Sequence, residues 1–429
     1  MTADGGADAP ADASDLPMNP LKGDGVVTAT AIYEAETFLD PRNSRVPREW
    51  VPVDVAVGPW GEIWAIQRVT RRPDTGFDDV TECTERAFYS RDYDDDDCTS
   101  LVGSTVSIAD PGNAEPATKA NGRAIVVSDY NSVHFMRRPS GIAFGEPETT
   151  LAPGPGSMSM DGRQMLSEPI TYIFPFANCS DHLTGNPTDG SPFNGPSLWT
   201  ADPAIYTGDN GTESWSNGSH LDMVHGTSYC TGIAWERDNV FWAINGAADS
   251  FDRYDFAEPH LAGHWYHGDA SIKRYQWEGD GPVRVADVPS NVIVEAGALY
   301  VADSGNGRVI SMALDAAGTP AGTFFSYEGL ESDRIANAPL ETIIDQAALA
   351  AEWGGSAVPS GLAVLDPETL VVANNASGHV SLVGLDGSII RTIDTGVGAG
   401  IGGLTVFNGV IYFTHMTDRR IYRLDVAAS

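Results

Sequence analysis

The chain has 429 residues, of which 42% are hydrophobic, a fraction typical of a globular rather than a disordered protein. Its 59 acidic and 25 basic residues give a formal net charge of −34. This charge excludes nucleic-acid binding as a main function, because phosphate recognition needs a basic surface, and it disfavours binding to anionic lipid. The sequence contains no apolar run near the roughly 20 residues that a membrane-spanning helix needs.

Residues 1–24 are rich in Ala, Asp, Gly and Pro and predict a solvated, disordered acidic tether ahead of one folded domain at 25–429. The segment has no apolar stretch of the signal-peptide type. Tethers of this kind follow the anchor cysteine of many bacterial lipoproteins. We therefore expect an extracytoplasmic protein that is secreted, periplasmic or held at a surface as a lipoprotein.

One short phrase recurs six times: a Pro or another small residue, followed by alternating apolar residues. The last two copies begin about 43 residues apart, which is a normal length for a propeller blade. The copies are Pro52–Val57, Pro139–Phe144, Thr231–Trp235, Pro289–Val294, Pro359–Val364 and Gly402–Val406.

After five of the six copies, a tight turn leads into a second strand of bulky and β-branched residues, and in most copies a third strand follows. A sheet of three or four strands cannot bury both faces alone, so the units must stack, and radial stacking hides both faces. The pattern predicts an all-β fold, a six-bladed β-propeller. The second strands are expected at 61–67, 239–245, 298–303, 369–374 and 410–415.

The two ends of the chain are expected to close the ring. Val26–Glu36 alternates as a strand, and the last copy lacks a fourth strand that this segment can supply. The second copy is weak beyond Phe144, so an irregular ring of five blades plus one stays open. Only Leu340–Trp353 has helical periodicity. Long insertions are expected mainly at 68–104, 145–220, 257–270 and 326–357.

Four cysteines, none in a CxxC pair, argue against a zinc ribbon or a thioredoxin-like site. Disulfides Cys83–Cys98 and Cys179–Cys230 are one of three possible pairings and would indicate an oxidising compartment. The alternative is four buried thiols.

The run Tyr300–Ile310 (YVADSGNGRVI) resembles the NHL repeat, and the region from about 50 to 428 resembles a six-bladed NHL-type propeller. Blades 1 to 3 depart from the repeat pattern. Propellers of this superfamily include a peptidyl-hydroxyglycine amidating lyase, streptogramin lyase, gluconolactonase-like enzymes and pure interaction modules. The resemblance to the amidating lyase implies zinc held by histidines from different blades, with His415 and His220 or His225 as the nearest counterparts, and calcium deeper inside. The catalytic Tyr and Arg of that enzyme have no match here.

Polar residues stand where the second strands end, and in a propeller these positions lie beside the channel. Converging polar side chains form a natural binding site for a small molecule, peptide or glycan. The alternative is that they cap tight turns, as Asn and Asp often do. The residues are Gln67, Asn245, Asp303, Asn374 and His415.

Five of the nine histidines fall between 220 and 267, in two loops of one blade. Imidazole and carboxylate groups are common ligands of zinc and copper. In simple propeller topology the two loops lie on opposite faces, so a joint site would need one loop to fold over the rim. The alternative is an ordinary polar loop. The candidate metal ligands are His220, Asp222 and His225 in the first loop, and His260, His264, His267 and Asp269 in the second.

The acidic run Asp92–Asp97, with Glu82 and Glu85 nearby, offers oxygen ligands for calcium but lacks the EF-hand spacing; a solvated charge run is the alternative. Together these features predict an exported, metal-binding propeller, acting as a metal-dependent lyase or hydrolase with its site in the central funnel. The other hypothesis is a non-catalytic module that binds a protein or glycan through its long loops. A monomer is expected in either case.

Overall fold

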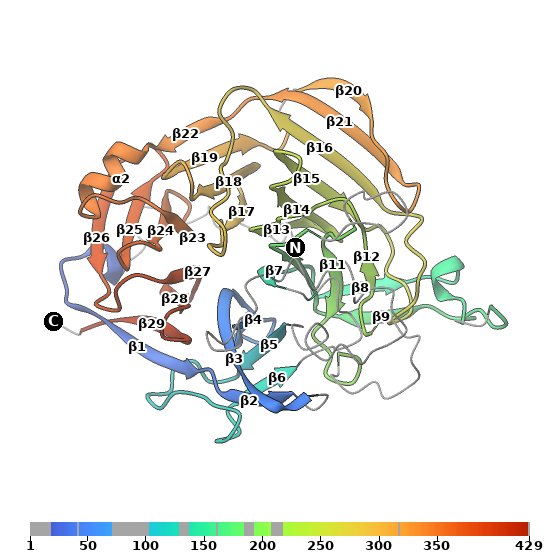
Figure 1. Ribbon diagram of the computed structural model, residues 1–429, viewed down its shortest axis with the longest axis horizontal. Coiled ribbons are helices and arrows are strands. Elements are labelled where there is room, and N and C mark those ends of the chain that lie inside the picture. The colour runs from blue at the N-terminus through green and yellow to red at the C-terminus, as the bar shows by residue number, and fades with distance from the viewer. Residues whose placement is uncertain are drawn as a thin grey trace, which may run out of the picture.

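The computed structural model describes residues 19–40, 43–70, 103–127, 136, 138–159, 162–183, 193–206, 218–315 and 318–427. Six mainly antiparallel sheets are arranged in a ring, so the predicted six-bladed propeller is confirmed (Figure 1). Buried apolar side chains fill the seams between neighbouring blades. Among the described residues, no helix has the length and apolar character to cross a bilayer.

Each copy of the repeated phrase forms the innermost strand of a sheet, and these strands number the blades 1 to 6 in chain order. Their alternating apolar residues pack against the second strand of the same blade and the inner strands next to it. The inner strands are β3 (Asn43–Val57), β7 (Pro139–Phe144), β13 (Ile233–Arg237), β17 (Val292–Glu295), β23 (Pro359–Asp366) and β27 (Ile401–Phe407).

The second strands are the most deeply buried, because neighbouring blades cover both of their faces. All five predicted second strands are present, and blade 2, where none was defined from the sequence, supplies β10. They are β4 (Ile63–Thr70), β10 (Pro175–Ser180), β14 (Val240–Asn245), β18 (Ala298–Asp303), β24 (Thr369–Asn374) and β28 (Val410–His415).

The third and fourth strands complete each sheet toward the outside of the ring. The third strands are β5 (Ser104–Ile108), β11 (Ser197–Thr200), β15 (Ser250–Asp255), β19 (Arg308–Ala313), β25 (His379–Gly384) and β29 (Arg420–Val426). The fourth strands of blades 1 to 5 are β6 (Ala124–Val127), β12 (Asp222–Met223), β16 (Ser271–Trp277), β22 (Glu341–Ile344) and β26 (Ile389–Asp394).

The N-terminal strand closes the ring as predicted. β1 (Val27–Glu34) pairs antiparallel with β29, with Val27 opposite Val426 and Glu34 opposite Arg420. Figure 1 shows this blue strand beside the red last blade. Of the predicted tether, residues 1–18 lie outside the described residues; within the remainder, Pro20–Lys22 forms a short 3-10 turn (η2) with Leu21 buried.

Insertions add elements around the ring. The predicted helix over Leu340–Trp353 is shorter than expected: its first part is β22, paired with β19, and α2 (Gln346–Glu352) begins only after Asp345, whose side chain caps it. β2 (Thr37–Asp40) pairs with β3. In blade 2, β8 (Glu148–Leu151) and β9 (Ile170–Ile173) form a hairpin, and η4 (Pro155–Ser157) between them is a 3-10 turn. β20 (Thr319–Thr323) and β21 (Glu331–Ala338) extend blade 3, because β21 pairs in parallel with β16.

The channel is closed at one level by a pair of side chains from opposite blades. Asp54 accepts hydrogen bonds from the Asn291 side chain at 2.9 Å and from the backbone N–H of Ile142 at 3.0 Å. Asn291 in turn accepts from the N–H groups of Leu362 and Leu404. The pair therefore links five of the six blades, and a cavity of about 270 Å³ lined by the inner strands adjoins it.

One disulfide, Cys179–Cys230, joins the second strand of blade 2 to the connection that enters blade 3, and both cysteines are buried. It confirms one of the two predicted pairs. The other predicted pair, Cys83–Cys98, lies outside the described residues, as does the acidic calcium candidate Asp92–Asp97 with Glu82 and Glu85.

Candidate metal centre

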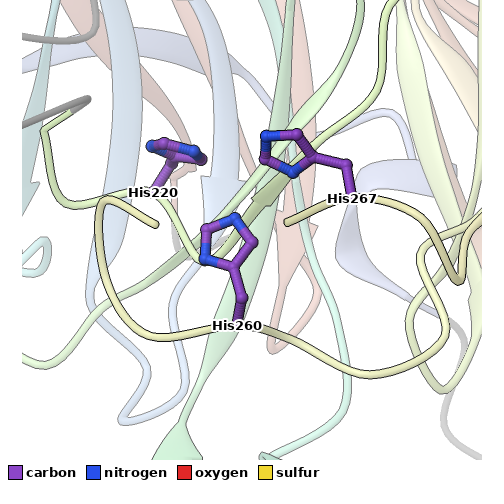
Figure 2. A group of neighbouring side chains, drawn as sticks. All are labelled: His220, His260 and His267. Carbon is purple, nitrogen blue, oxygen red and sulfur yellow. The ribbon is translucent and has the colours of Figure 1, made fainter. Parts of the chain in front are cut away.

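Three buried histidines meet at the outer part of the seam between blades 2 and 3. His220 lies just before β12, whereas His260 and His267 lie in the loop between β15 and β16. Figure 2 shows the three rings facing one another from these separate segments. The backbone fastens the loop to the strand, because the His260 N–H donates to the Leu221 carbonyl at 2.7 Å and the Gly263 N–H donates to the His220 carbonyl at 2.8 Å.

A glycine permits this close approach. Gly263 has a φ of +74°, and a Cβ at this position would come within 2.3 Å of the Gly218 carbonyl oxygen. Only glycine adopts such a conformation without strain while leaving room for the neighbouring chain. The loop can therefore lie directly on the segment that carries His220.

The three imidazoles form a compact set. One ligand nitrogen from each ring can be chosen so that all lie within 4.8 Å of one another. The exposed fractions are 1% for His220, 1% for His260 and 7% for His267. Within the described ranges, this is the one group of three His, Cys, Asp or Glu residues with ligand atoms this close.

Hydrogen bonds orient two of the rings. The Nδ1 atom of His267 lies 2.9 Å from Oδ1 of Asp222, and Nδ1 of His260 lies 2.7 Å from the Leu261 carbonyl oxygen, which can only accept. The Nδ1 proton of His260 is thereby fixed, and its Nε2 carries a lone pair. The Nε2 atoms of His260 and His267 are buried and have no hydrogen-bond partner among the described residues. A carboxylate or carbonyl behind a histidine is the usual support of a metal ligand.

The buried environment keeps the rings of His260 and His267 neutral. Burial, followed by the neighbouring imidazoles, lowers the pKa of His260 well below its ordinary value, and burial lowers the pKa of His267 to about 2. Neutral imidazole is the form that binds metal. Burial, followed by the charge of Asp269, raises the pKa of Asp222 well above its ordinary value. A cation at the rings would favour ionised Asp222 as the acceptor for His267.

Three imidazole nitrogens suit a borderline metal such as zinc or copper, whereas calcium prefers oxygen ligands. Tetrahedral zinc with bonds of about 2.0–2.1 Å would leave one further position for water or another ligand. Metal binding would draw the nitrogens inward, since such bonds place them about 3.3 Å apart.

The structure thus brings together histidines from both predicted loops. The two loops were expected on opposite faces of the propeller. They meet because the second loop folds along the outer edge of blade 2, against the segment that carries His220. Of the remaining candidates, His225 contacts Glu328 of the β20–β21 insertion, and His264 accepts from the Tyr266 N–H. Asp269 accepts from the Glu258 N–H outside the triad. The triad lies at a blade seam and not in the central funnel.

The five polar residues at the second-strand ends are buried, and each has hydrogen-bond or ion-pair partners within the protein. Gln67 bonds Tyr33 and Ser104, and Asn245 bonds Asp252 and the Gly226 carbonyl. Asp303 accepts from Val283, Asn306 and Arg308. Asn374 bonds Ser377 and accepts from Val358, and His415 pairs with Asp418. Four of the five accept a hydrogen bond from a backbone N–H of the turn that follows them, whereas Gln67 bonds two side chains. The four are Asn245, Asp303, Asn374 and His415. The predicted ligand binding of all five stays a prediction.

Sequence reasoning missed the axial pair of Asp54 and Asn291, although a signal was present. Both stand directly before the alternating apolar residues of the repeated phrase, at the position where the other four copies have glycine. A Cβ on one of these glycines, Gly403, would lie 1.8 Å from Oδ1 of Asp54. Gly403 therefore makes room for the Asp54 side chain on the axis.

No family model matches the chain, and no curated protein matches it. Solved structures with a similar fold include a protein of unknown function from Bacteroides thetaiotaomicron (9% identity, 94% of this chain and 77% of that chain covered, TM-score 0.49). Others are virginiamycin B lyase from Staphylococcus aureus (10%, 94% and 100%, 0.38) and a calcium-binding protein, regucalcin, from Agrobacterium tumefaciens (12%, 92% and 95%, 0.40). The propeller fold that the resemblance implied is confirmed by the ring of six sheets in the structure itself.

Proposed function

We propose that this chain is a metal-binding propeller in which the Nε2 atoms of His260 and His267, together with His220, hold zinc or copper. The observation that carries the proposal is the convergence of three buried imidazoles from two separate segments, two of them with buried Nε2 atoms that have no hydrogen-bond partner among the described residues. A buried ring nitrogen without a hydrogen-bond partner is costly, and a cation held by the rings would satisfy the nitrogens of His260 and His267 together.

The metal's role in this proposal is to fasten blade 3 to blade 2. β12 has only two residues, and it pairs with β11 at just two positions, so the outer edge of blade 2 has few backbone hydrogen bonds. A metal that joins His220 to His260 and His267 adds coordination bonds across this seam. The rings are almost fully buried, so access of a substrate is restricted, and this burial favours a structural metal. The ligand set itself, three imidazoles with a fourth position open, is the one usual for catalytic zinc.

The lyase or hydrolase activity expected from the family resemblance would need a metal position that substrate can reach. The triad lies at the outer strand of blade 2, whereas the axial cavity is lined by the inner strands. This position gives no support to a metal-dependent lyase or hydrolase. Export is supported by the Cys179–Cys230 disulfide, because disulfides persist mainly in oxidising compartments.

Metal analysis of protein purified without chelators tests the proposal. We expect about one equivalent of zinc or copper, lost in His260→Ala and in His267→Ala. His264→Ala is the matched control, because His264 lies in the same loop but outside the triad. Metal-free wild-type protein that takes up neither ion after dialysis would refute the proposal and leave the alternative of a metal-free partner-binding module.

A further inference from the structure

A second polar cluster surrounds the mouth of the channel, on the face where the second strands end. Arg68 follows Gln67 near the end of β4 in blade 1, and Arg138 directly precedes β7 in blade 2. Asp287 lies in the connection that enters β17 of blade 4. Because inner strands line the axis, residues just ahead of them lie around its opening.

One carboxylate joins these three blades. Arg68 donates from Nη1 to Oδ1 of Asp287 at 3.2 Å and from Nη2 to the Asp287 carbonyl at 2.8 Å. The Nη2 group of Arg138 contacts the same carboxylate oxygen. The Asp287 side chain is 57% exposed, whereas those of Arg68 and Arg138 are only 13% and 24% exposed. The guanidinium groups are therefore the fixed part of the contact and the carboxylate is the accessible part.

Further contacts hold the frame around this contact. The buried carboxylate of Asp181 accepts from Nε of Arg284 at 2.5 Å and from the Asp287 N–H at 3.2 Å. The Arg284 guanidinium lies over the ring of Tyr229 at 4.5 Å. The connection is thus anchored by its backbone and by Arg284, and the Asp287 side chain can leave the two arginines without releasing the loop.

The three arginines and two aspartates sum to one positive charge, in a chain whose net charge is −34. Guanidinium groups match the geometry of carboxylates, and partial burial strengthens such pairs relative to exposed ones. Asp287 also has a φ of +69°, a left-handed backbone that Asp tolerates better than most residues. These features describe a carboxylate-binding pair of arginines occupied by the chain's own aspartate.

We propose that Arg68 and Arg138 form a binding site for a carboxylate-bearing ligand at the channel mouth, and that Asp287 occupies this site when no ligand is bound. The ligand's carboxylate replaces that of Asp287, which swings into solvent. The rest of the ligand then lies over the mouth of the channel. This inference is independent of the metal proposal, because none of its residues belongs to the histidine triad.

Asp287→Gly tests the site, because glycine accepts the φ of +69° and leaves the two guanidinium groups without their carboxylate. The probe is acetate, titrated by calorimetry at constant ionic strength. We expect acetate to bind Asp287→Gly at least about tenfold more tightly than wild type, a difference of about 1.4 kcal/mol. Adding Arg68→Gln should abolish the gain. Asp249→Gly is the matched control, since Asp249 is exposed and also has a positive φ, of 49°.

Equal acetate affinity in Asp287→Gly and wild type would overturn the inference, and so would a gain that survives Arg68→Gln. Binding of inorganic phosphate without binding of acetate would overturn the carboxylate assignment. If Asp287→Gly does not fold, Asp287→Asn supplies the same comparison, because asparagine fits this backbone and removes the charge.

Discussion

Asp222 provides the sharpest test of the metal centre, because it touches a ligand without being one. Asp222→Asn keeps the shape of the side chain, and its amide oxygen can still accept from Nδ1 of His267 and from the Met223 N–H, which lie 2.9 and 2.6 Å from Oδ1 of Asp222. The change removes the negative charge behind the imidazole. Loss of such a supporting carboxylate typically weakens metal affinity about 10- to 100-fold, or about 1.4–2.7 kcal/mol.

The lower metal affinity of Asp222→Asn should also reduce the thermal stability that metal confers. At a free metal concentration 100 times the wild-type dissociation constant, binding stabilises the folded protein by about 2.7 kcal/mol. A hundredfold weaker Asp222→Asn site would be half occupied there and would gain only about 0.4 kcal/mol. With about 2 °C per kcal/mol for a large domain, the metal-induced rise in Tm should fall from about 5 °C to about 1 °C.

Competition with a chromophoric chelator measures the affinity, and calorimetric scans with and without metal measure the rise in Tm. Asp269→Asn is the control. The charge of Asp269 acts on Asp222, but its carboxylate accepts a hydrogen bond from the Glu258 N–H rather than from a triad ring. Wild-type affinity in Asp222→Asn would refute the idea that this carboxylate orients His267 for metal.

Three further predictions concern stability. Replacing Cys179 and Cys230 by alanine should lower the free energy of unfolding by about 4 kcal/mol, since the bond closes a 51-residue separation; urea denaturation measures it. Gly403→Ala should cost about 1–3 kcal/mol through its clash with Asp54, whereas Gly112→Ala, with open space around it, should be neutral in the same assay. Burial raises the pKa of Asp54 from 3.8 to about 6, so the folded state holds a proton that the unfolded state loses. Unfolding free energy should therefore fall by about 3 kcal/mol between about pH 3 and pH 7, and Asp54→Asn should remove this part of the slope.

The fold could be predicted because each blade repeats one local pattern. Alternating apolar residues between turns specify strands wherever they occur, and the unpaired alternation of Val26–Glu36 identified the strand that closes the ring. Blade 2 escaped prediction beyond Phe144 because β10 begins only at Pro175, after a hairpin and a 3-10 turn. The segment Leu340–Trp353 was misread because edge pairing with β19 overrides its helical propensity until Asp345.

The sequence could predict which histidines are candidate metal ligands, but not which of them come together in the fold. Histidines are rare in this chain, so their clustering drew attention to both loops. Which of them converge depends on how the loop carrying His260 lies on the segment carrying His220, and that contact requires Gly263 beside Gly218. Long-range packing of this kind leaves no periodic signal in a single sequence. The arginines at the channel mouth were missed for the same reason, since Arg68 and Asp287 are 219 residues apart.

The reinforcement of the ring is concentrated where its repeating structure is weakest. Blade 2 has a two-residue outer strand, yet its seam with blade 3 contains the Cys179–Cys230 disulfide, the histidine triad and the contact of His225 with Glu328 from a later insertion. In a propeller each blade is stabilised mainly by its two neighbours, so one poorly paired blade weakens two seams. The disulfide restricts the unfolded chain, and a metal would bind only the folded site, so both would compensate for missing backbone pairing without a larger core. The sparse backbone pairing at the outer edge of blade 2 is therefore a physical reason to expect a metal at this seam.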